Sequence, residues 1–136
     1  MEPLRFEILV ALLWKKQEYE CKLTPKTNDK GIDVVAVRGN AGLLMQVKSS
    51  GQNSAELSPD AIKEVVAGAP FYKKQVRSVG FALACVTNQS FGKGARAFAL
   101  AHDVRLIELQ ELGSLLGQYP MRMSELCVAD LSAEFA

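Results

Sequence analysis

Histidine is almost absent from this chain, because His102 is the only one among its 136 residues. A histidine-rich metal site or a Ser-His-Asp triad would have to be built on this single residue, so both are disfavoured. Cysteine is scarce as well: Cys21, Cys85 and Cys127 lie too far apart in sequence for a zinc knuckle or a redox pair. We therefore interpret His102 as a helix-terminal residue and the cysteines as reduced thiols, with Cys85 in the core.

Long apolar runs are missing too. The longest strongly apolar stretch, residues 8–14, is far shorter than the roughly 20 residues needed to cross a bilayer. The first residues also lack the basic segment, apolar core and cleavage site of a secretory signal. The sequence thus predicts no membrane span and a cytoplasmic protein.

The chain does contain enough apolar sequence for one core, since 49% of its residues are hydrophobic and 23% are charged. We expect one domain over residues 1–119, followed by a tail, 120–136, that packs on this domain or on a partner subunit. Charge is uneven: residues 1–105 hold 15 lysines and arginines against 10 acids, a net +5, and residues 106–136 hold 1 against 5, a net −4. A basic body of this kind is compatible with binding a polyanion.

Apolar spacing and turn-forming residues divide the chain into alternating elements. We expect helices at residues 3–16, from Ser58 to a break at Pro70, in the segment capped by Ser90, and at residues 111–116. Strands are expected at residues 18–23, 32–37, 43–47, 79–86 and 104–109. This order predicts an α/β fold in which a mixed central sheet has helices on both sides.

The strands at 32–37 and 43–47 predict a hairpin with Asn40 and Ala41 as its turn residues. In that register Asp33 lies opposite Lys48, and opposed residues project to the same side of a sheet. Gln46, two residues from Lys48, shares that side. A carboxylate, an amide and an ammonium group are therefore expected together at one end of an otherwise apolar hairpin.

This combination of groups suits phosphodiester hydrolysis. Asp33, the side-chain carbonyl of Gln46 and the backbone carbonyl of Val47 offer the oxygen ligands that a hard divalent cation prefers. Lys48 can position the attacking water and balance charge on the phosphate. The competing interpretation is a buried Asp–Lys ion pair that only satisfies itself at a strand end.

Glu7 lies between Phe6 and Ile8 in the most apolar predicted helix, where a carboxylate is unusual unless a cation is near. It could hold a metal-bound water or orient Lys48. Alternatively, Glu7 is an acid in the first turns of a helix, a place that the helix dipole favours.

Taken together, these residues resemble the Mrr-type restriction endonuclease domain of the PD-(D/E)xK nuclease superfamily. The resemblance spans about residues 4–117 and rests on ordered segments: Phe6-Glu7, Asp29-Lys30-Gly31-Ile32-Asp33, Gln46-Val47-Lys48, Val86-Thr87-Asn88, Phe91, Ala95, Ala99 and Val104-Arg105-Leu106-Ile107. It implies a restriction-endonuclease-like α/β/α sandwich and Mg²⁺-dependent DNA cleavage, in which Mn²⁺ can replace Mg²⁺. It also implies metal-site positions at Asp33 and Gln46, the catalytic lysine at Lys48, and the acid of the first helix at Glu7.

Two groups of basic residues are candidate phosphate contacts. Lys73 and Lys74 follow the predicted helix break at Pro70, whereas Lys93 and Arg96 lie in the first turns of the helix capped by Ser90, where free N–H groups favour anions. The alternative is a solvated basic face without a partner. The polar segments 26–30 and 49–57 are further candidates for contact with nucleic acid.

The sequence thus predicts a metal-dependent DNA endonuclease of defence or mobile-element type, acting on double-stranded DNA and able to form a homodimer. Two alternatives stay open. One is a structure-specific nuclease, such as a junction-resolving enzyme, and the other is a catalytically silent DNA-binding module that kept the fold. The presence of both Asp33 and Lys48 argues against a silent site.

Overall fold

The computed structural model describes residues 3–24, 31–49 and 57–127. Within these ranges, five strands form one mixed sheet in the order β1-β2-β3-β4-β5. Neighbours pair antiparallel from β1 (Glu20–Leu23) through β2 (Val34–Arg38) to β3 (Ala41–Lys48), and parallel from β3 through β4 (Gly80–Thr87) to β5 (Val104–Ile107). Parallel neighbours need a crossover connection, which explains why a helix precedes both β4 and β5.

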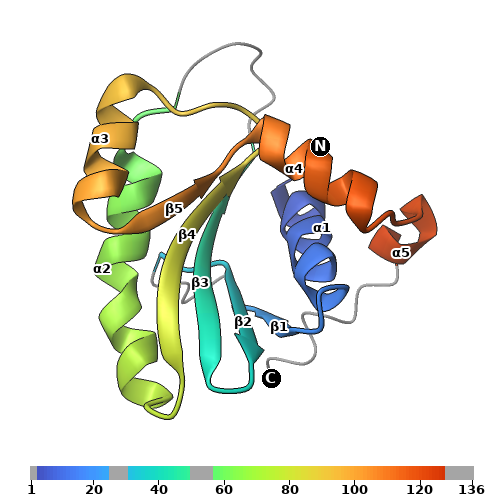
Figure 1. Cartoon of the computed structure of the whole chain (residues 1–136), viewed down its shortest axis with the longest axis horizontal. Helices are drawn as coiled ribbons and strands as arrows, with labels where there is room; N and C mark the ends of the chain where they lie inside the picture. The colour runs from blue at the N-terminus through green and yellow to red at the C-terminus, as the bar shows by residue number, and fades with distance from the viewer. Residues whose placement is uncertain (1–2, 25–30, 50–56, 128–136) are drawn as a thin grey trace.

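Helices cover both faces of this sheet (Figure 1). On one face lie α1 (Pro3–Lys15), α4 (Leu109–Gln118) and α5 (Met123–Cys127), and on the other lie α2 (Asp60–Gln75) and α3 (Lys93–Ala101). These are the layers of the predicted α/β/α sandwich, and the mixed sheet is confirmed.

Successive side chains of a strand point to opposite faces of the sheet, so each face has its own cluster of buried apolar residues. Met45 and Val47 belong to the cluster beneath α1, whereas Leu44 and Cys85 belong to the cluster beneath α2 and α3. Gln46 alternates with Met45 and Val47 along β3, so its side chain lies on the α2 face. The sheet therefore presents the predicted metal ligand to α2 rather than to α1.

The hairpin between β2 and β3 turns one residue earlier than the sequence predicts. Arg38 pairs with Ala41, so the turn residues are Gly39 and Asn40, and the predicted Asn40-Ala41 turn is wrong. Gly39 has a φ of +64°, whereas Asn40 is not in the positive-φ region. A glycine at the first turn position with positive φ is typical of type II′ hairpins. The register consequently shifts by two residues, and Asp33 is not opposite Lys48.

Two predicted helix limits also differ from the structure. α2 continues through Pro70 to Gln75. Pro70 is exposed, so solvent can satisfy the backbone carbonyl that loses its N–H partner there. Ser90 does not cap α3, which begins at Lys93. Instead, the Ser90 carbonyl accepts the N–H of Leu57 at 3.0 Å, within a short parallel bridge that holds this segment extended.

The segment predicted as a tail contains α5, which packs against α1. Leu126 belongs to the cluster beneath α1, and Lys16 Nζ lies 3.1 Å from Glu125 Oε2. The backbone N–H of Arg122 and the Lys16 ammonium lower the pKa of Glu125. Residues 120–127 thus contact the body of the chain, whereas the rest of the predicted tail, 128–136, lies outside the described residues, as do the segments 25–30 and 50–56.

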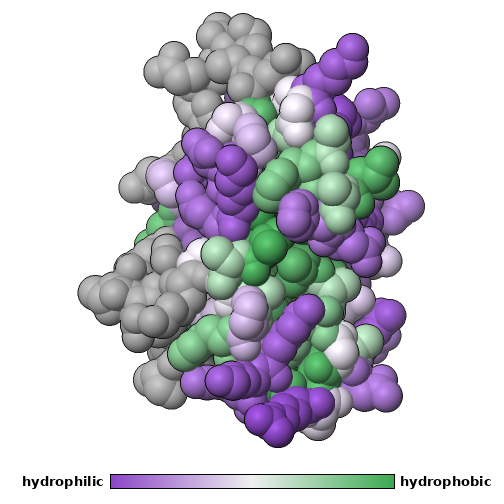
Figure 2. Space-filling view, turned by 90° about the vertical axis from the view of Figure 1, so that its left-hand side faces the viewer, coloured by the Kyte–Doolittle hydropathy of each residue, from purple (hydrophilic) through white to green (hydrophobic). Residues whose placement is uncertain are grey.

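The surface over α2 and α3 mixes hydrophobic and hydrophilic side chains, with a hydrophobic band between hydrophilic flanks (Figure 2). Leu100, on α3, is 86% exposed, and Phe71 and Val76 are also among the exposed large hydrophobic residues. None of the described helices is long and apolar enough to cross a membrane.

Candidate active site

The carboxyl ends of β3 and β4 lie side by side at one edge of the sheet, where Lys48 is aligned with Thr87. Both α1 and α2 begin at this edge (Figure 1). Ligands of open α/β sheets bind beyond the carboxyl ends of the strands. The predicted 46–48 segment therefore ends where a site is expected.

Asp33 lies directly before β2 and is hydrogen-bonded to β3 through both its buried carboxylate and its backbone. Its Oδ2 accepts the N–H of Val47 at 2.9 Å, and the Asp33 N–H donates to the carbonyl of Met45 at 2.8 Å. Val34 is also aligned with Met45, so two residues of one strand oppose one residue of the other, as in a β-bulge. Bulges redirect side chains, and this one brings the Asp33 carboxylate to the middle of the 46–48 segment.

Gln46 is 6% exposed and makes one side-chain hydrogen bond, from its Nε2 to Glu64 Oε2 at 2.8 Å. Its Oε1 is buried, and no hydrogen-bond partner lies near it in the described part of the chain. An unsatisfied buried carbonyl costs about 1–3 kcal/mol. This oxygen is therefore well placed to bind a ligand.

Glu64 was not singled out by the sequence, because it belongs to no motif and is an exposed acid on a helix. The signal that points to it is positional. It lies directly before the buried Val65, on the helix that follows the 46–48 segment and packs on the same face as Gln46.

Lys48 is exposed at the end of β3. Across the described ranges, no carboxylate lies within ion-pair distance of its ammonium group. The alternative of a self-satisfied Asp33–Lys48 pair is therefore not what the structure forms. Lys48 presents its charge to solvent at the site edge.

Glu7 is 5% exposed within the second turn of α1. α1 packs on the face of the sheet opposite α2, but it starts at the same edge as the carboxyl ends of β3 and β4 (Figure 1). Glu7 does not pair with Lys48. Its predicted part in the site stays a prediction.

Cys85 is aligned with Gln46 on the neighbouring strand and lies in the core, as predicted. Burial, followed by the negative charges of Glu64 and Asp33, raises the pKa of the Cys85 thiol to about 12. Neither Cys21 nor Cys85 forms a disulfide bond within the described part of the chain, in agreement with the predicted reduced thiols. The Glu64 and Asp33 carboxylates thus both place negative charge near Cys85, on the strand beside Gln46, and negative charge favours a nearby cation.

Residues 1–116 match the Mrr_cat family model, described as restriction endonuclease. The chain belongs to the Mrr_cat restriction endonuclease family. The nuclease function and the restriction-endonuclease-like fold predicted from the sequence are thereby confirmed. No curated protein matches the chain.

Three solved structures share the fold of this Mrr_cat chain. AF1548, a protein of unknown function, is 21% identical with a TM-score of 0.63, over 88% of this chain and 68% of its own. The MspJI restriction endonuclease, in complex with a 27-mer oligonucleotide, is 21% identical with a TM-score of 0.61, over 98% of this chain and 31% of its own. The DNA modification-dependent restriction endonuclease AspBHI is 16% identical with a TM-score of 0.60, over 90% and 33%. The chain thus spans about a third of each of these two enzymes.

The donor set of the Mrr_cat site fits a hard divalent cation. In the described ranges no three or more histidine, cysteine or acidic residues gather into a group that could hold a metal. The Asp33 carboxylate and the buried, unpartnered Oε1 of Gln46 are instead oxygen donors, which Mg²⁺ and Mn²⁺ accept.

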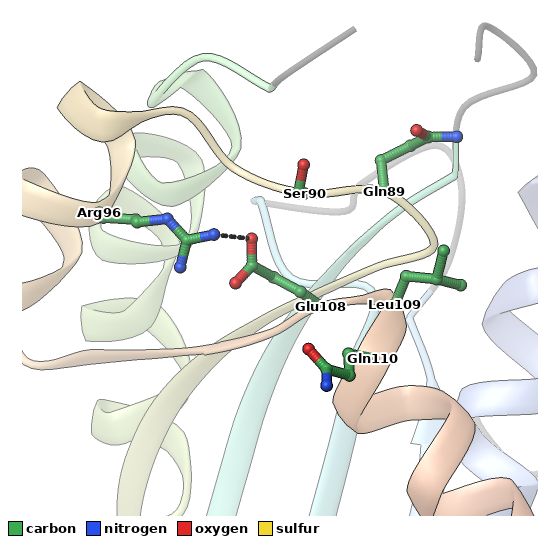
Figure 3. A pocket seen from close by; sticks show the side chains of 6 residues that line it. All are labelled: Gln89, Ser90, Arg96, Glu108, Leu109 and Gln110. Carbon is green, nitrogen blue, oxygen red and sulfur yellow. Dashed lines mark hydrogen bonds and ion pairs between the residues drawn. The ribbon is translucent and has the colours of Figure 1, made fainter. Parts of the chain in front are cut away.

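A hollow of about 340 Å³ lies beyond the carboxyl ends of β4 and β5, next to this site. It is lined by Gln89, Ser90, Arg96, Glu108, Leu109 and Gln110 (Figure 3). Arg96 points across the hollow to Glu108, with 2.7 Å between Nη2 and Oε2. Arg96, one of the four predicted phosphate contacts, thus forms an ion pair within the chain.

The structure separates the predicted phosphate contacts into two groups. The N–H of Gly80 donates to the carbonyl of Asn40 at 2.8 Å, so β4 starts beside the hairpin turn. Lys73 and Lys74 end the helix that leads to this start, whereas Lys93 follows the far end of β4. At about 3.3 Å per residue, a strand of 8 residues separates the two ends by roughly 25 Å.

Proposed function

We propose that this chain hydrolyses phosphodiester bonds of double-stranded DNA with a divalent cation at Asp33, Gln46 and the Val47 carbonyl. The observation that carries the proposal is the arrangement at the end of the β2–β3 hairpin. There, the Asp33 carboxylate accepts the N–H of Val47, which lies between the buried Gln46 and Lys48, and Lys48 forms no ion pair with a described residue. Mg²⁺ is the proposed cation, and Mn²⁺ a substitute.

Each side chain has a defined task in this mechanism. When bound, the cation supplies Lewis-acid stabilisation of the phosphate. Asp33 offers a negative oxygen whose position is fixed by the Val47 N–H. Lys48, free of any described carboxylate, orients the attacking water and offsets negative charge that develops on the phosphate oxygens. Glu7 is proposed to assist from α1 by holding water or by orienting Lys48.

We propose that DNA passes over the edge at which β3, β4 and β5 end. Lys93 lies at the start of α3 on this side, where helix N–H groups favour anions. Lys73 and Lys74 lie at the opposite end of α2, so a short duplex bound at the active edge contacts them only if it also runs along the α2 face. DNA as a partner is supported by the MspJI complex, whose fold is similar.

The deciding experiment is a cleavage assay on supercoiled plasmid, with purified chain, Mg²⁺ or Mn²⁺, and a matched reaction containing EDTA. Nicked or linear product only with the metal supports a metal-dependent endonuclease. Absence of product with both metals and several DNA substrates would overturn the proposal and favour a silent binding module. Comparing linear duplex with four-way junctions separates a defence-type endonuclease from a junction-resolving enzyme.

The remaining expectations stay proposals. These are the division into a nuclease domain at 1–119 and a tail at 120–136, a homodimer, and a cytoplasmic location.

A further inference from the structure

We propose that Glu64 is a positioning residue that orients the Gln46 amide for metal binding, an inference that rests on the proposed function. Gln46 Nε2 donates to Glu64 Oε2 at 2.8 Å. An ionised carboxylate only accepts hydrogen bonds, so it selects the NH₂ end of the amide and turns the carbonyl end away. Glu64 thereby decides which end of Gln46 faces the site.

The orientation of this amide matters because its two ends differ in chemistry. The carbonyl oxygen can bind a cation, whereas the NH₂ group repels one. Oε1 of Gln46 is buried and has no hydrogen-bond partner among the described residues. The Asp33 carboxylate is fixed one residue further along β3, at the N–H of Val47. Because Glu64 accepts the NH₂ group of Gln46, the Oε1 atom stays available as a metal ligand, together with the Asp33 carboxylate.

Backbone packing fixes Glu64 relative to the hairpin. A Cβ atom placed on Gly31 would lie 2.3 Å from the carbonyl oxygen of Glu64, and Gly31 has a φ of +84°. The segment that leads to Asp33 therefore packs directly on α2 at Glu64, with no room for a side chain between them. This packing fixes the backbone of Glu64 relative to Asp33. The hydrogen bond from Gln46 to Glu64 therefore does not depend only on the flexible Glu64 side chain.

A test uses Glu64→Gln in the full chain, because this change keeps the size of the side chain but lets Gln46 bond through either end of its amide. Mn²⁺ affinity, measured by titration calorimetry, should fall by about tenfold, the scale of one hydrogen bond to a charged group. The metal concentration for half-maximal cleavage should rise by a similar factor. The rate at saturating metal should stay within about threefold of wild type, since the reacting groups are intact.

The matched control is Asp60→Asn, which removes one negative charge from the same helix one turn earlier. It should change Mn²⁺ affinity by less than about twofold, because no hydrogen bond joins Asp60 to Gln46 in the described part of the chain. The side-chain amide signal of Gln46 in ¹⁵N-correlated NMR, assigned by its loss in Gln46→Glu, should move in Glu64→Gln and stay in place in Asp60→Asn. A merely structural role of Glu64 would lower thermal stability without this signature.

Equal Mn²⁺ affinities of wild type, Glu64→Gln and Asp60→Asn would overturn the inference while leaving the proposed function intact, provided that Asp33→Asn lowers the affinity. If the wild type binds no Mn²⁺ and cleaves no DNA, the proposed function itself fails, and the inference fails with it.

Discussion

Arg96 and Glu108 form an ion pair at 2.7 Å, and the same Glu108 oxygen accepts the N–H of Phe91 at 2.7 Å. The pair joins the start of α3 to the residue that follows β5, and so closes one side of the hollow beyond the strand ends (Figure 3). Glu108 thus already balances the charge of Arg96, so of the two predicted phosphate contacts on α3, Lys93 is the one that forms no ion pair with a described residue.

The first prediction concerns this difference between Lys93 and the distant lysines. Lys93→Gln should weaken binding of unrelated DNA sequences about equally and lower the slope of log affinity against log salt by about 0.9, the value for one lost phosphate contact. The double change Lys73→Gln and Lys74→Gln should leave the slope for a short duplex unchanged. Fluorescence anisotropy at several salt concentrations measures both slopes. An altered slope only in the double variant would place DNA along α2 instead.

Lys48→Ala should abolish cleavage without unfolding the chain. Lys48 is exposed and has no described ion pair, so its removal should change stability by less than about 0.5 kcal/mol. The plasmid assay and thermal unfolding together test this, with Lys63→Ala as the control for loss of one exposed lysine. Near-wild-type cleavage by Lys48→Ala would contradict the mechanism.

Asp33→Asn should weaken Mg²⁺ and Mn²⁺ binding and cleavage together, because it removes the charge of the proposed ligand. The amide oxygen can still accept the Val47 N–H, so the fold should lose only about 1 kcal/mol, the difference between a charged and a neutral hydrogen bond. Titration calorimetry with each metal, beside chemical unfolding, checks both parts. Unchanged metal affinity would place the cation elsewhere.

Cys85 should make stability fall at alkaline pH. Burial raises the pKa of the Cys85 thiol from its ordinary value of 9.0 to about 12 in the folded chain. The stability that the neutral thiol contributes is therefore fully present below pH about 9 and is lost as pH rises toward 12. Between pH 9 and 10, wild type should lose roughly 1 kcal/mol relative to Cys85→Ala, on the scale of 1.4 kcal/mol per pKa unit. Urea unfolding at each pH measures this difference, and a constant difference would show that the thiol ionises normally.

Gly31→Ala should destabilise the fold by roughly 2–4 kcal/mol, because it combines a strained positive φ with a clash against the Glu64 carbonyl. Gly39→Ala is the matched control: its φ is +64°, but nothing lies within 4 Å of the added Cβ atom. It should cost only about 1–2 kcal/mol. Similar losses in both variants, measured by urea unfolding, would argue against the tight contact between the Gly31 segment and α2.

The sequence by itself determined the order of elements, the two-faced mixed sheet and the residues of the hairpin end. Apolar periodicity and turn residues are local properties, so they locate α1, the strands and the Gln46-Val47-Lys48 segment within a few residues. Local rules failed where tertiary contacts compete with them: Pro70 is tolerated on an exposed helix face, and Ser90 pairs with Leu57 instead of capping α3.

Only the tertiary structure decided how the site residues meet. Gly39, with its positive φ, is a turn residue, and the hairpin register therefore differs by two residues from the predicted one. A bulge places the Asp33 carboxylate at the N–H of Val47, and Asp33 is not opposite Lys48. Glu64 entered the site only because α2 folds back over the sheet and reaches Gln46 from 18 positions away in sequence. The contact between Glu64 and Gln46 depends on how the helix packs on the face of the sheet, and the spacing of the two residues in the sequence does not predict it.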